Sequence, residues 1–556
     1  GKIVLTSAPP GVAVQNAVYA KGAVGVVTYA PSESKNPLDY PDQIGWSRIN
    51  VNPPVGKKGT FAFVLSPRKG DTLRRILSTD ATHDLFGTGK RTKGGRLLLK
   101  AKVDTEIGTQ VPGRTGFVEG WIRGTKHRDQ QIVLTAHLQE EQGSANDDGS
   151  GCGNLLELAR TFNKLIREGK MPRPERDIRF WWTDEIYSEY RYFQDHPEET
   201  KKLLANVHQD MTGANQALGS RVQHLIHAPH SRTSYLDAVF ESIGTYVINT
   251  NNGFLAASRQ GGLPRPHTRP LYATRGSRQG YNARFVPYFG SSDHMCFVDG
   301  AVGVPAVALI NWDDDFIHSS DDDLDKIDQT QLRRNNFLIG SIAYYLAFAK
   351  DASVPTLAAE TFAQGTRRLA NDLRVALGLL RDERGTPEES WKHASAIVEQ
   401  GTRREERALN SMRVFAGGNA QMLGLVDEFV ARVKGREAEL TADLQTYYRQ
   451  VHGKTPAPAR LSAEEEAAAK KVPVNAPTLA AYFDNRQNVR FRTGLHGLMR
   501  DEVFNFVDGR RSYYDIYKAV YAEAAAAGSW YYGTVTLKDV AGLLDAGVEA
   551  KALTLK

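Results

Sequence analysis

The stretch that decides the fold runs Ile132-Val133-Leu134-Thr135-Ala136-His137 and resumes as Ala145-Asn146-Asp147-Asp148-Gly149-Ser150-Gly151. The first part is a nearly continuous apolar run, typical of a buried central strand, and it ends in a histidine. The second part ends in small residues that let the backbone turn tightly. Residues 151–166 follow with the broad apolar face of a helix. This order predicts a strand–turn–helix unit of an α/β sheet.

Strand patterns lie on both sides of this unit. Residues 97–103 and 116–122 alternate between apolar and polar side chains, whereas residues 178–182 and 304–310 are apolar runs. These strands alternate with helices along the chain. The predicted fold class is therefore α/β, with a mixed, mostly parallel sheet sandwiched by helices.

Length and composition limit the possibilities further. The chain has 556 residues, more than one hydrophobic core accommodates, so two to four domains are expected. Its net charge is only +6, and the basic residues are dispersed, so nucleic acid is not an expected partner. No apolar stretch is long enough for a bilayer, so no membrane span is expected.

The composition changes several times along the chain. The start resembles a small α/β module, with a short helix at 14–21 and another at 71–77 capped by Asp71. After the α/β segment the chain becomes rich in Ala, Arg and Glu, which predicts helices, and then in Pro and Ala, which predicts a linker. The last part combines helix patterns with a final strand, as in a winged-helix-like unit. The predicted boundaries are 1–92, 93–352, 353–452 (helical), 453–478 (linker) and 479–556 (winged-helix-like).

Acidic and imidazole side chains follow several of the predicted strands. Parallel strands deliver such groups to one edge of a sheet, and two histidines with several carboxylates suit a pair of ions such as Zn²⁺. We expect Asp147 to lie between two metals, with Asp184 as the general base that takes the proton from water. The predicted set points to metal-assisted hydrolysis, with ligands His137, Asp147, Glu185, Asp210 and His318.

Each motif alone has a simpler explanation. The run at 146–149 alone is more typical of a turn or helix cap, Asp184-Glu185 of a solvated acidic pair, and a lone His137 of a structural histidine. Their joint order and placement at strand ends favour a metal site. Tyr187, Tyr281 and Tyr288 are candidates to stabilise an oxyanion. Tyr288 is preferred because it precedes Ser292-Asp293-His294, although such tyrosines are more often pocket walls.

With these motifs, residues 130–330 resemble the co-catalytic zinc aminopeptidase and glutamate carboxypeptidase family. The similarity rests on the stretches quoted above and on Gln209-Asp210-Met211-Thr212-Gly213 and His318-Ser319-Ser320-Asp321-Asp322. It implies two Zn²⁺ ions, a zinc exopeptidase fold, a peptide substrate and a supporting role for Asp322. Residues 1–92, through Gly22-Ala23-Val24-Gly25-Val26-Val27, are similar to the protease-associated (PA) domain that this family often carries. The resemblance implies that the chain starts inside this insertion.

The chain departs from the family pattern at three places. Gln139 stands where an acid usually orients the first histidine, and it can still accept a hydrogen bond from His137. Such a change typically lowers metal affinity or activity by about 10–100-fold. Asp184 replaces a glutamate, which withdraws the carboxylate by about one methylene. Residues 186–190 replace a Gly-rich run, so substrate contacts there cannot be transferred.

The favoured function is removal of N-terminal residues by a two-zinc aminopeptidase. Asp148, Glu189 or Asp293 could bind the substrate amine, whereas a carboxypeptidase would need a cation such as Arg284. One alternative is a glutaminyl-cyclase-like transferase with a single zinc. Another is a catalytically impaired binding or scaffold protein.

The resemblance also suggests where the protein acts and what it binds. It implies a secreted, periplasmic or cell-surface location, although no signal peptide is visible. Residues 357–451 could form a homodimer surface. Cys152 and Cys296 are too few for a disulfide framework and are interpreted as small buried residues.

Overall fold

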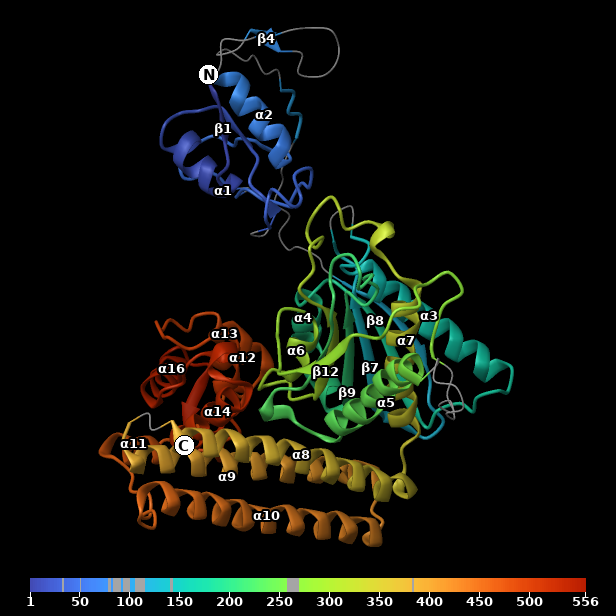
Figure 1. Cartoon of the computed structure of the whole chain (residues 1–556), viewed down its shortest axis with the longest axis vertical. Coiled ribbons are helices and arrows are strands. Elements are labelled where there is room, and N and C mark those ends of the chain that lie inside the picture. The colour runs from blue at the N-terminus through green and yellow to red at the C-terminus, as the bar shows by residue number, and fades with distance from the viewer. Residues whose placement is uncertain are drawn as a thin grey trace.

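The computed structural model describes residues 1–32, 35–50, 52–78, 82–83, 92–93, 101–105, 116–140, 144–257, 270–382 and 385–556. An N-terminal α/β module stands apart from a central α/β domain (Figure 1). Three long helices run beneath that domain, and a small helical domain lies beside it. Within the described residues, no helix has the length and apolar character needed to cross a membrane.

A seven-stranded mixed sheet forms the centre of the molecule. Its order is β11-β10-β12-β9-β7-β8-β6. Four neighbouring pairs are parallel, and only β10/β12 and β6/β8 are antiparallel. The prediction of a mixed, mostly parallel sheet is confirmed. The strands are β6 (Val118–Ile122), β7 (His127–His137), β8 (Arg176–Thr183), β9 (Leu203–Asp210), β10 (Gln223–Ile226), β11 (Ala283–Val286) and β12 (Ala306–Asn311).

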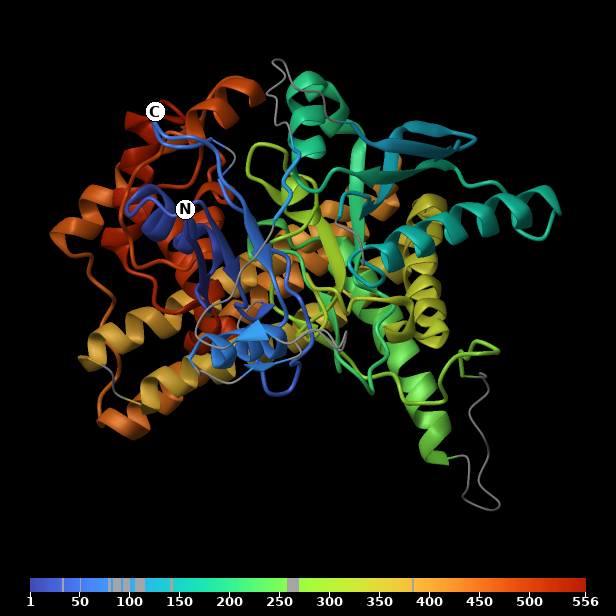
Figure 2. The ribbon, with the colours of Figure 1, turned by 90° about the horizontal axis from the view of Figure 1, so that it is seen from above.

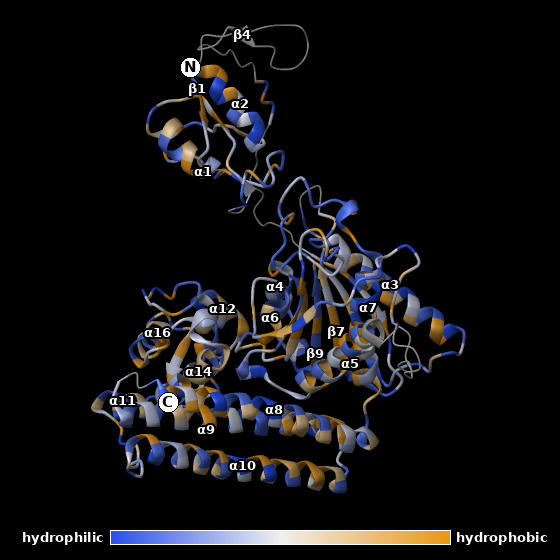
Figure 3. Ribbon diagram, in the orientation of Figure 1, coloured by the Kyte–Doolittle hydropathy of each residue, from blue (hydrophilic) through white to orange (hydrophobic). Residues whose placement is uncertain are grey.

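Both faces of this sheet are covered, and the alternation along β7 shows how. Ile132 and Leu134 join a core with α3, α5 and α7, whereas Val133 joins a second core with α4, α6 and the C-terminal domain. A strand buried on both faces explains the continuous apolar run of β7 (Figure 3). The covering helices are α3 (Gly149–Arg167), α4 (Tyr187–Asp195), α5 (Tyr235–Ala257), α6 (His294–Val298) and α7 (Gln329–Phe348).

The N-terminal module has its own three-stranded parallel sheet. Its second helix begins at Pro67, four residues earlier than the predicted segment, and Asp71 does not cap it. Asp71 instead forms ion pairs along the helix with Arg74 and Arg75. Residues 97–100 of a predicted strand lie outside the described residues. The elements are β1 (Ile3–Thr6), α1 (Pro10–Ala13), η1 (Val14–Tyr19), β2 (Gly25–Thr28), β3 (Ala62–Val64), α2 (Pro67–Leu77), β4 (Thr82–His83) and β5 (Thr92–Lys93).

The C-terminal part is helical, and part of the expected linker forms a helix and a strand. Ser462 caps a short helix through a capping box, and Pro473–Asn475 pairs antiparallel with Leu553–Leu555. This pairing joins the two ends of the last domain. The elements are α8 (Val354–Arg381), α9 (Pro387–Ser411), α10 (Ala420–His452), α11 (Ala463–Ala469), β13 (Pro473–Asn475), α12 (Leu479–Arg486), α13 (Gly497–Asn505), α14 (Tyr513–Ala527), α15 (Ser529–Tyr532), α16 (Leu537–Glu549) and β14 (Leu553–Leu555).

Candidate metal centre

The fold brings the five predicted ligands to one edge of the sheet. His137 and Asp210 are the last residues of the parallel neighbours β7 and β9. Glu185 follows the end of β8, and Asp147 precedes the first turn of α3. His318 lies in the loop after β12. Since parallel strands deliver their carboxyl ends to the same edge, residues far apart in sequence converge here.

Asp147 occupies the middle of this group. The Nε2 atom of His137 lies 3.4 Å from one Asp147 carboxylate oxygen, and the Nε2 atom of His318 lies 3.2 Å from the other. His137 Nε2 is also 3.5 Å from Asp210 Oδ2. Possible ligand atoms of His137, Glu185 and Asp210 all lie within 4.8 Å of one another. The spacing is that of groups that can share metal ions.

The charge at this edge fits cations. Four carboxylates, from Glu140, Asp147, Glu185 and Asp210, surround His137. Asp210 Oδ1 is buried without a hydrogen-bond partner, and burial raises the pKa of Glu185 to about 7. Buried carboxylates that lack sufficient donors are costly unless a cation compensates them. Oxygen and imidazole donors together suit a divalent ion such as Zn²⁺.

Two further carboxylates hold the ligand-bearing segments together. Asp148 accepts hydrogen bonds from the backbone N–H groups of His137 (3.0 Å), Gly151 (3.0 Å) and Met211 (3.1 Å). It thereby ties the ends of β7 and β9 to the start of α3. Asp322 accepts from the N–H groups of Asn146 (2.9 Å) and Asp147 (3.0 Å), so it contacts the segment that carries Asp147.

The backbone is strained beside three of the ligands. Ile186, Met211 and His318 have φ angles of 67°, 56° and 54°. Non-glycine residues in such conformations cost about 1–3 kcal/mol each and persist only where their surroundings enforce them. Ile186 and Met211 directly follow Glu185 and Asp210. The strain is thus concentrated where side chains must be held in position.

Gln139 does not make the contact predicted for it. Its Oε1 accepts a hydrogen bond from the backbone N–H of Glu185 at 2.7 Å, and its Nε2 lies 3.5 Å from the Glu185 carboxylate. The next residue, Glu140, instead places a carboxylate oxygen 3.5 Å from His137 Nδ1. Glu140, one position after Gln139, is therefore the acid that approaches the His137 imidazole. Sequence reasoning missed Glu140, although an acid directly after Gln139 was a usable signal.

The other predicted site residues lie in different environments. Asp184 is half-buried beside Glu185, and its backbone N–H donates to Ser188 Oγ. Tyr187 is 75% exposed, whereas the Tyr281 hydroxyl donates to Asn335 Oδ1. Tyr288 differs from the prediction. It follows β11, which runs parallel to β10 and antiparallel to β12, so it leaves the sheet at the opposite edge from the ligands.

The acids considered for amine binding are engaged internally. Asp293 accepts from Thr183 Oγ1 (2.6 Å) and from the Ile186 N–H (3.0 Å), and buried Glu189 accepts from Ser188 Oγ. Asp148 is occupied by the three backbone contacts described above. Cys152 and Cys296 are free thiols. Cys152 Sγ donates to the His137 carbonyl oxygen at 3.1 Å, so it supports the β7 end.

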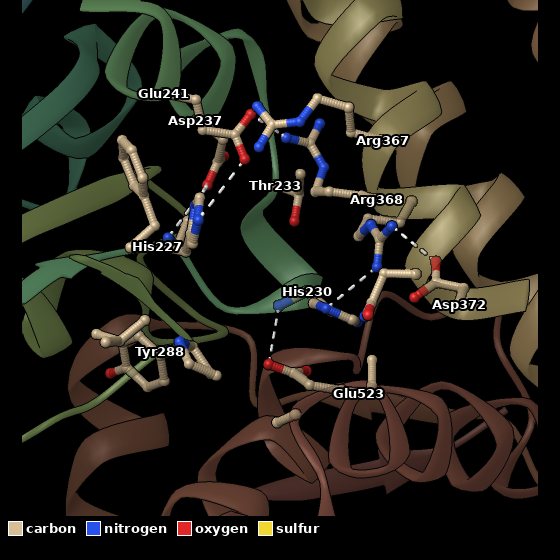
Figure 4. Close-up of a pocket in the computed structure, with 18 of the residues that line it drawn as sticks. His227, His230, Thr233, Asp237, Glu241, Tyr288, Arg367, Arg368, Asp372 and Glu523 are labelled. Atoms are coloured by element: carbon tan, nitrogen blue, oxygen red, sulfur yellow. Dashed lines mark hydrogen bonds and ion pairs between the residues drawn. The ribbon is translucent and has the colours of Figure 1, made fainter. Parts of the chain in front are cut away.

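A second polar cavity, of about 330 Å³, lies at the opposite edge of the sheet (Figure 4). His230 follows β10 and meets Arg404 from α9 and Glu523 from α14. Arg404 pairs with Asp372 at 2.9 Å and with Glu405 at 2.7 Å. Burial opposes ionisation of Glu405, but Arg368 and Arg404 outweigh it and lower its pKa to about 2. Arg368 and Arg404 are thus compensated by Asp372 and Glu405.

The chain is similar in part to several known proteins. A leucine aminopeptidase of Arthroderma otae, named as probable, is 26% identical over 236 residues, which is 39% of this chain and 54% of that protein. A relative with the same name from Trichophyton verrucosum is 24% identical over 249 residues, 43% of this chain and 57% of that protein. The chain thus spans about half the length of these relatives.

Solved structures give weaker similarity. BSAP, a zinc aminopeptidase from Bacillus subtilis, matches with 18% identity and a TM-score of 0.37, covering 62% of this chain and 70% of that chain. A Peptidase M28 precursor from Shewanella amazonensis matches with 20% identity and a TM-score of 0.34, covering 60% and 63%. The family model described as Peptidase family M28 matches residues 118–258, a span that contains four of the five predicted ligands. Residues 118–258 of this chain are therefore similar to Peptidase family M28.

Proposed function

We propose that the protein is a zinc-dependent aminopeptidase that releases N-terminal residues from peptides. The observation that carries this proposal is the position of Asp147, whose two carboxylate oxygens face His137 and His318 separately. A carboxylate in that position can bridge two ions. His137 and Asp210 would complete one metal site, and Glu185 and His318 the other.

Ions bound by these residues would polarise the scissile carbonyl and lower the pKa of water. Asp184 is the candidate general base. It lies next to Glu185 at the end of β8 and would take the proton of the attacking water and return it to the leaving amine. Asp148 and Asp322 would keep the ligand-bearing segments in register through their backbone contacts.

An aminopeptidase also needs negative charge for the protonated amine of its substrate. Glu140 and Glu185 are half-buried and belong to the ligand group, so they offer that charge at the site. A carboxypeptidase would need a cation instead. Arg284 is exposed on the edge strand β11, three strands from β9, or roughly 14 Å at about 4.8 Å per strand. This position favours recognition of an amine over recognition of a carboxylate.

Metal content and substrate specificity separate this function from the alternatives. We expect two zinc ions per chain and release of aminoacyl groups that a chelator abolishes and added Zn²⁺ restores. One zinc with cyclisation of N-terminal glutamine would favour a transferase. Absence of bound metal and of turnover would overturn both and favour a scaffold protein.

Asp184 provides the sharpest test of the mechanism. Asp184→Asn should lower kcat by about 10²–10⁴-fold, as expected for loss of a general base, while zinc content stays unchanged. Asp195→Asn, which alters an exposed surface pair with Arg191, is the matched control and should retain activity. Full turnover in Asp184→Asn would assign the base to another group.

The remaining assignments are part of the same proposal. We infer that the N-terminal module is of the protease-associated type, that the last domain is winged-helix-like and that the protein is secreted. Helices α8–α10 form the candidate homodimer surface. Sedimentation analysis tests the dimer: a single monomeric species at micromolar concentration would exclude it.

A further inference from the structure

The N-terminal module touches the central domain at the loop that carries His318. Figure 2 shows this module lying above the central domain. Residues 44–46 run antiparallel to residues 318–320, with a bridge between Gly45 and Ser319. The N–H of Ser320 donates to the Ile44 carbonyl oxygen at 2.9 Å, and the Ile44 N–H donates to Ser320 Oγ at 3.1 Å. The loop that carries His318 is thus hydrogen-bonded to residues 44–46 of the N-terminal module.

His318 receives the most contacts from this edge. The Trp46 N–H donates to the His318 carbonyl oxygen at 2.8 Å, and Ser32 Oγ donates to the same oxygen at 3.3 Å. The Trp46 indole stacks on the His318 imidazole, with ring centroids 5.0 Å apart and planes 22° apart. Both the backbone and the ring of a candidate metal ligand are therefore contacted from outside the central domain.

The backbone conformation of His318 must be held by its surroundings, and these contacts hold it. Its φ of 54° is unfavourable for a non-glycine residue, and its side chain is 38% exposed. Two hydrogen bonds to its carbonyl oxygen fix the backbone, and the indole covers one face of the imidazole. Gly45 lets residues 44–46 pack closely against Ser32, which also contacts His318, because a Cβ at Gly45 would lie 2.6 Å from Ser32 Cα.

The anchorage extends along the same loop. Tyr40 donates from its hydroxyl to Asp315 Oδ2 at 2.7 Å, and Gln43 Nε2 donates to the Asp315 carbonyl oxygen at 3.0 Å. The Tyr40 ring also packs edge-on against Phe316. The contact therefore includes several residues on each side, and the stacked pair lies at its end nearest the other ligands.

We propose that Trp46 is a positioning residue of the metal centre: it holds the His318 imidazole in the orientation that binds metal. This inference rests on the proposed function, because it takes His318 as a ligand. It adds that the N-terminal module completes the site and that the peptidase segment alone does not supply a fully ordered ligand set. Residues that orient metal ligands typically change metal affinity by about 10–100-fold when altered.

Zn²⁺ titration of the full, chelator-stripped chain against a competing chelator tests this role. Trp46→Leu, which keeps apolar bulk but removes the ring, should weaken the His318-dependent site by about 10–100-fold. Trp46→Phe should restore most of the affinity, and His318→Ala defines complete loss of that site. Trp530→Leu is the matched control, because Trp530 is 83% exposed in the C-terminal domain, and it should bind Zn²⁺ like the wild type.

A spectroscopic measurement supports the test without relying on affinity. Co²⁺ bound beside His318 should quench Trp46 fluorescence, so Trp46→Phe should lose part of the Co²⁺-dependent quenching and Trp530→Phe should not. If the wild type binds metal, His318→Ala weakens it and Trp46→Leu does not, the inference alone is overturned. Absence of metal binding in the wild type would overturn the proposed function and this inference together.

Discussion

Charged side chains are concentrated at both edges of the central sheet, but their charges are arranged differently. At the edge formed by the ends of β7, β8 and β9, four carboxylates surround His137, and a buried oxygen of Asp210 has no hydrogen-bond partner. At the opposite edge, Arg368 and Arg404 both form ion pairs with Glu405. The first cluster has more carboxylates than cationic partners, whereas in the second cluster Arg368 and Arg404 are paired with Asp372 and Glu405.

This difference separates a candidate reaction site from a structural contact. Paired buried charges need nothing else, since each one already has its partner. An excess of buried carboxylates is costly unless a cation compensates it, which makes the first edge a candidate site for cation binding. Variants at the two edges should therefore have opposite effects on activity and on stability.

The largest effect is expected on activity at the carboxylate-rich edge. Glu185→Gln should lower kcat/KM by about 10³-fold, since a ligand that supports several kcal/mol of metal catalysis is weakened. The metal-free protein should not lose stability, because the change relieves repulsion among carboxylates. Thermal unfolding with chelator and activity with zinc measure the two effects. A fall in metal-free Tm would contradict the charge argument, and Glu198→Gln, a surface change, serves as the control.

The opposite edge should show the reverse behaviour. Arg404→Met leaves Asp372 and part of Glu405 uncompensated, so the free energy of unfolding should fall by about 3–5 kcal/mol. Activity per folded molecule should remain, because the change lies at the other edge of the sheet from the metal ligands. Denaturant unfolding and active-site titration measure these quantities.

Arg403→Met is the neighbouring control for that variant. Arg403 forms a partly exposed pair with Glu399, and such pairs contribute about 0–1 kcal/mol. Equal losses of unfolding free energy in Arg404→Met and Arg403→Met would show that the buried network stabilises the fold no more than a partly exposed ion pair does.

A smaller change is expected at Glu140, which contacts His137 without belonging to the predicted ligand set. Glu140→Gln should weaken zinc binding by about 10–100-fold, because the carboxylate that orients the imidazole is lost. Gln139→Ala should affect zinc less, since Gln139 contacts Glu185 and not the imidazole. Zinc titrations against a competing chelator would show which variant binds zinc more weakly. A larger loss of affinity in Gln139→Ala would assign the orienting role to Gln139.

Much of this site could be predicted because its signals are local. His137, Asp147 and Asp210 lie at strand ends or before a helix, where apolar periodicity and small residues identify the position. The mostly parallel sheet follows from the alternation of strands with helices along the chain. The direction of β10 and β11 cannot be predicted from the sequence, because the hydrophobic pattern is the same for parallel and antiparallel strands. Tyr288 was preferred because it precedes Ser292-Asp293-His294, a position that does not reveal the direction of β11.

Contacts between modules were also beyond sequence reasoning. The stacking of Trp46 on His318 joins residues far apart in the chain, and nothing in either local pattern indicates it. The same holds for β13, whose partner β14 lies at the end of the chain and whose pairing orders part of the expected linker. Glu140 was missed for a simpler reason: its position is shifted by one residue from the family pattern.

The smallest effect should be a pH dependence of stability at the paired edge. Burial, and next the charge of Glu502, raise the pKa of Glu523 well above its usual value. Above the unfolded pKa of about 4.3, the unfolded chain releases this proton while the folded chain retains it. The contribution of Glu523 to stability therefore declines as pH rises. Glu523→Gln should raise Tm near pH 7 and leave it unchanged near pH 4, unlike the exposed control Glu549→Gln. A Tm difference that is constant with pH would mean that Glu523 titrates alike in the folded and unfolded chains, so that its carboxylate is compensated in the folded protein.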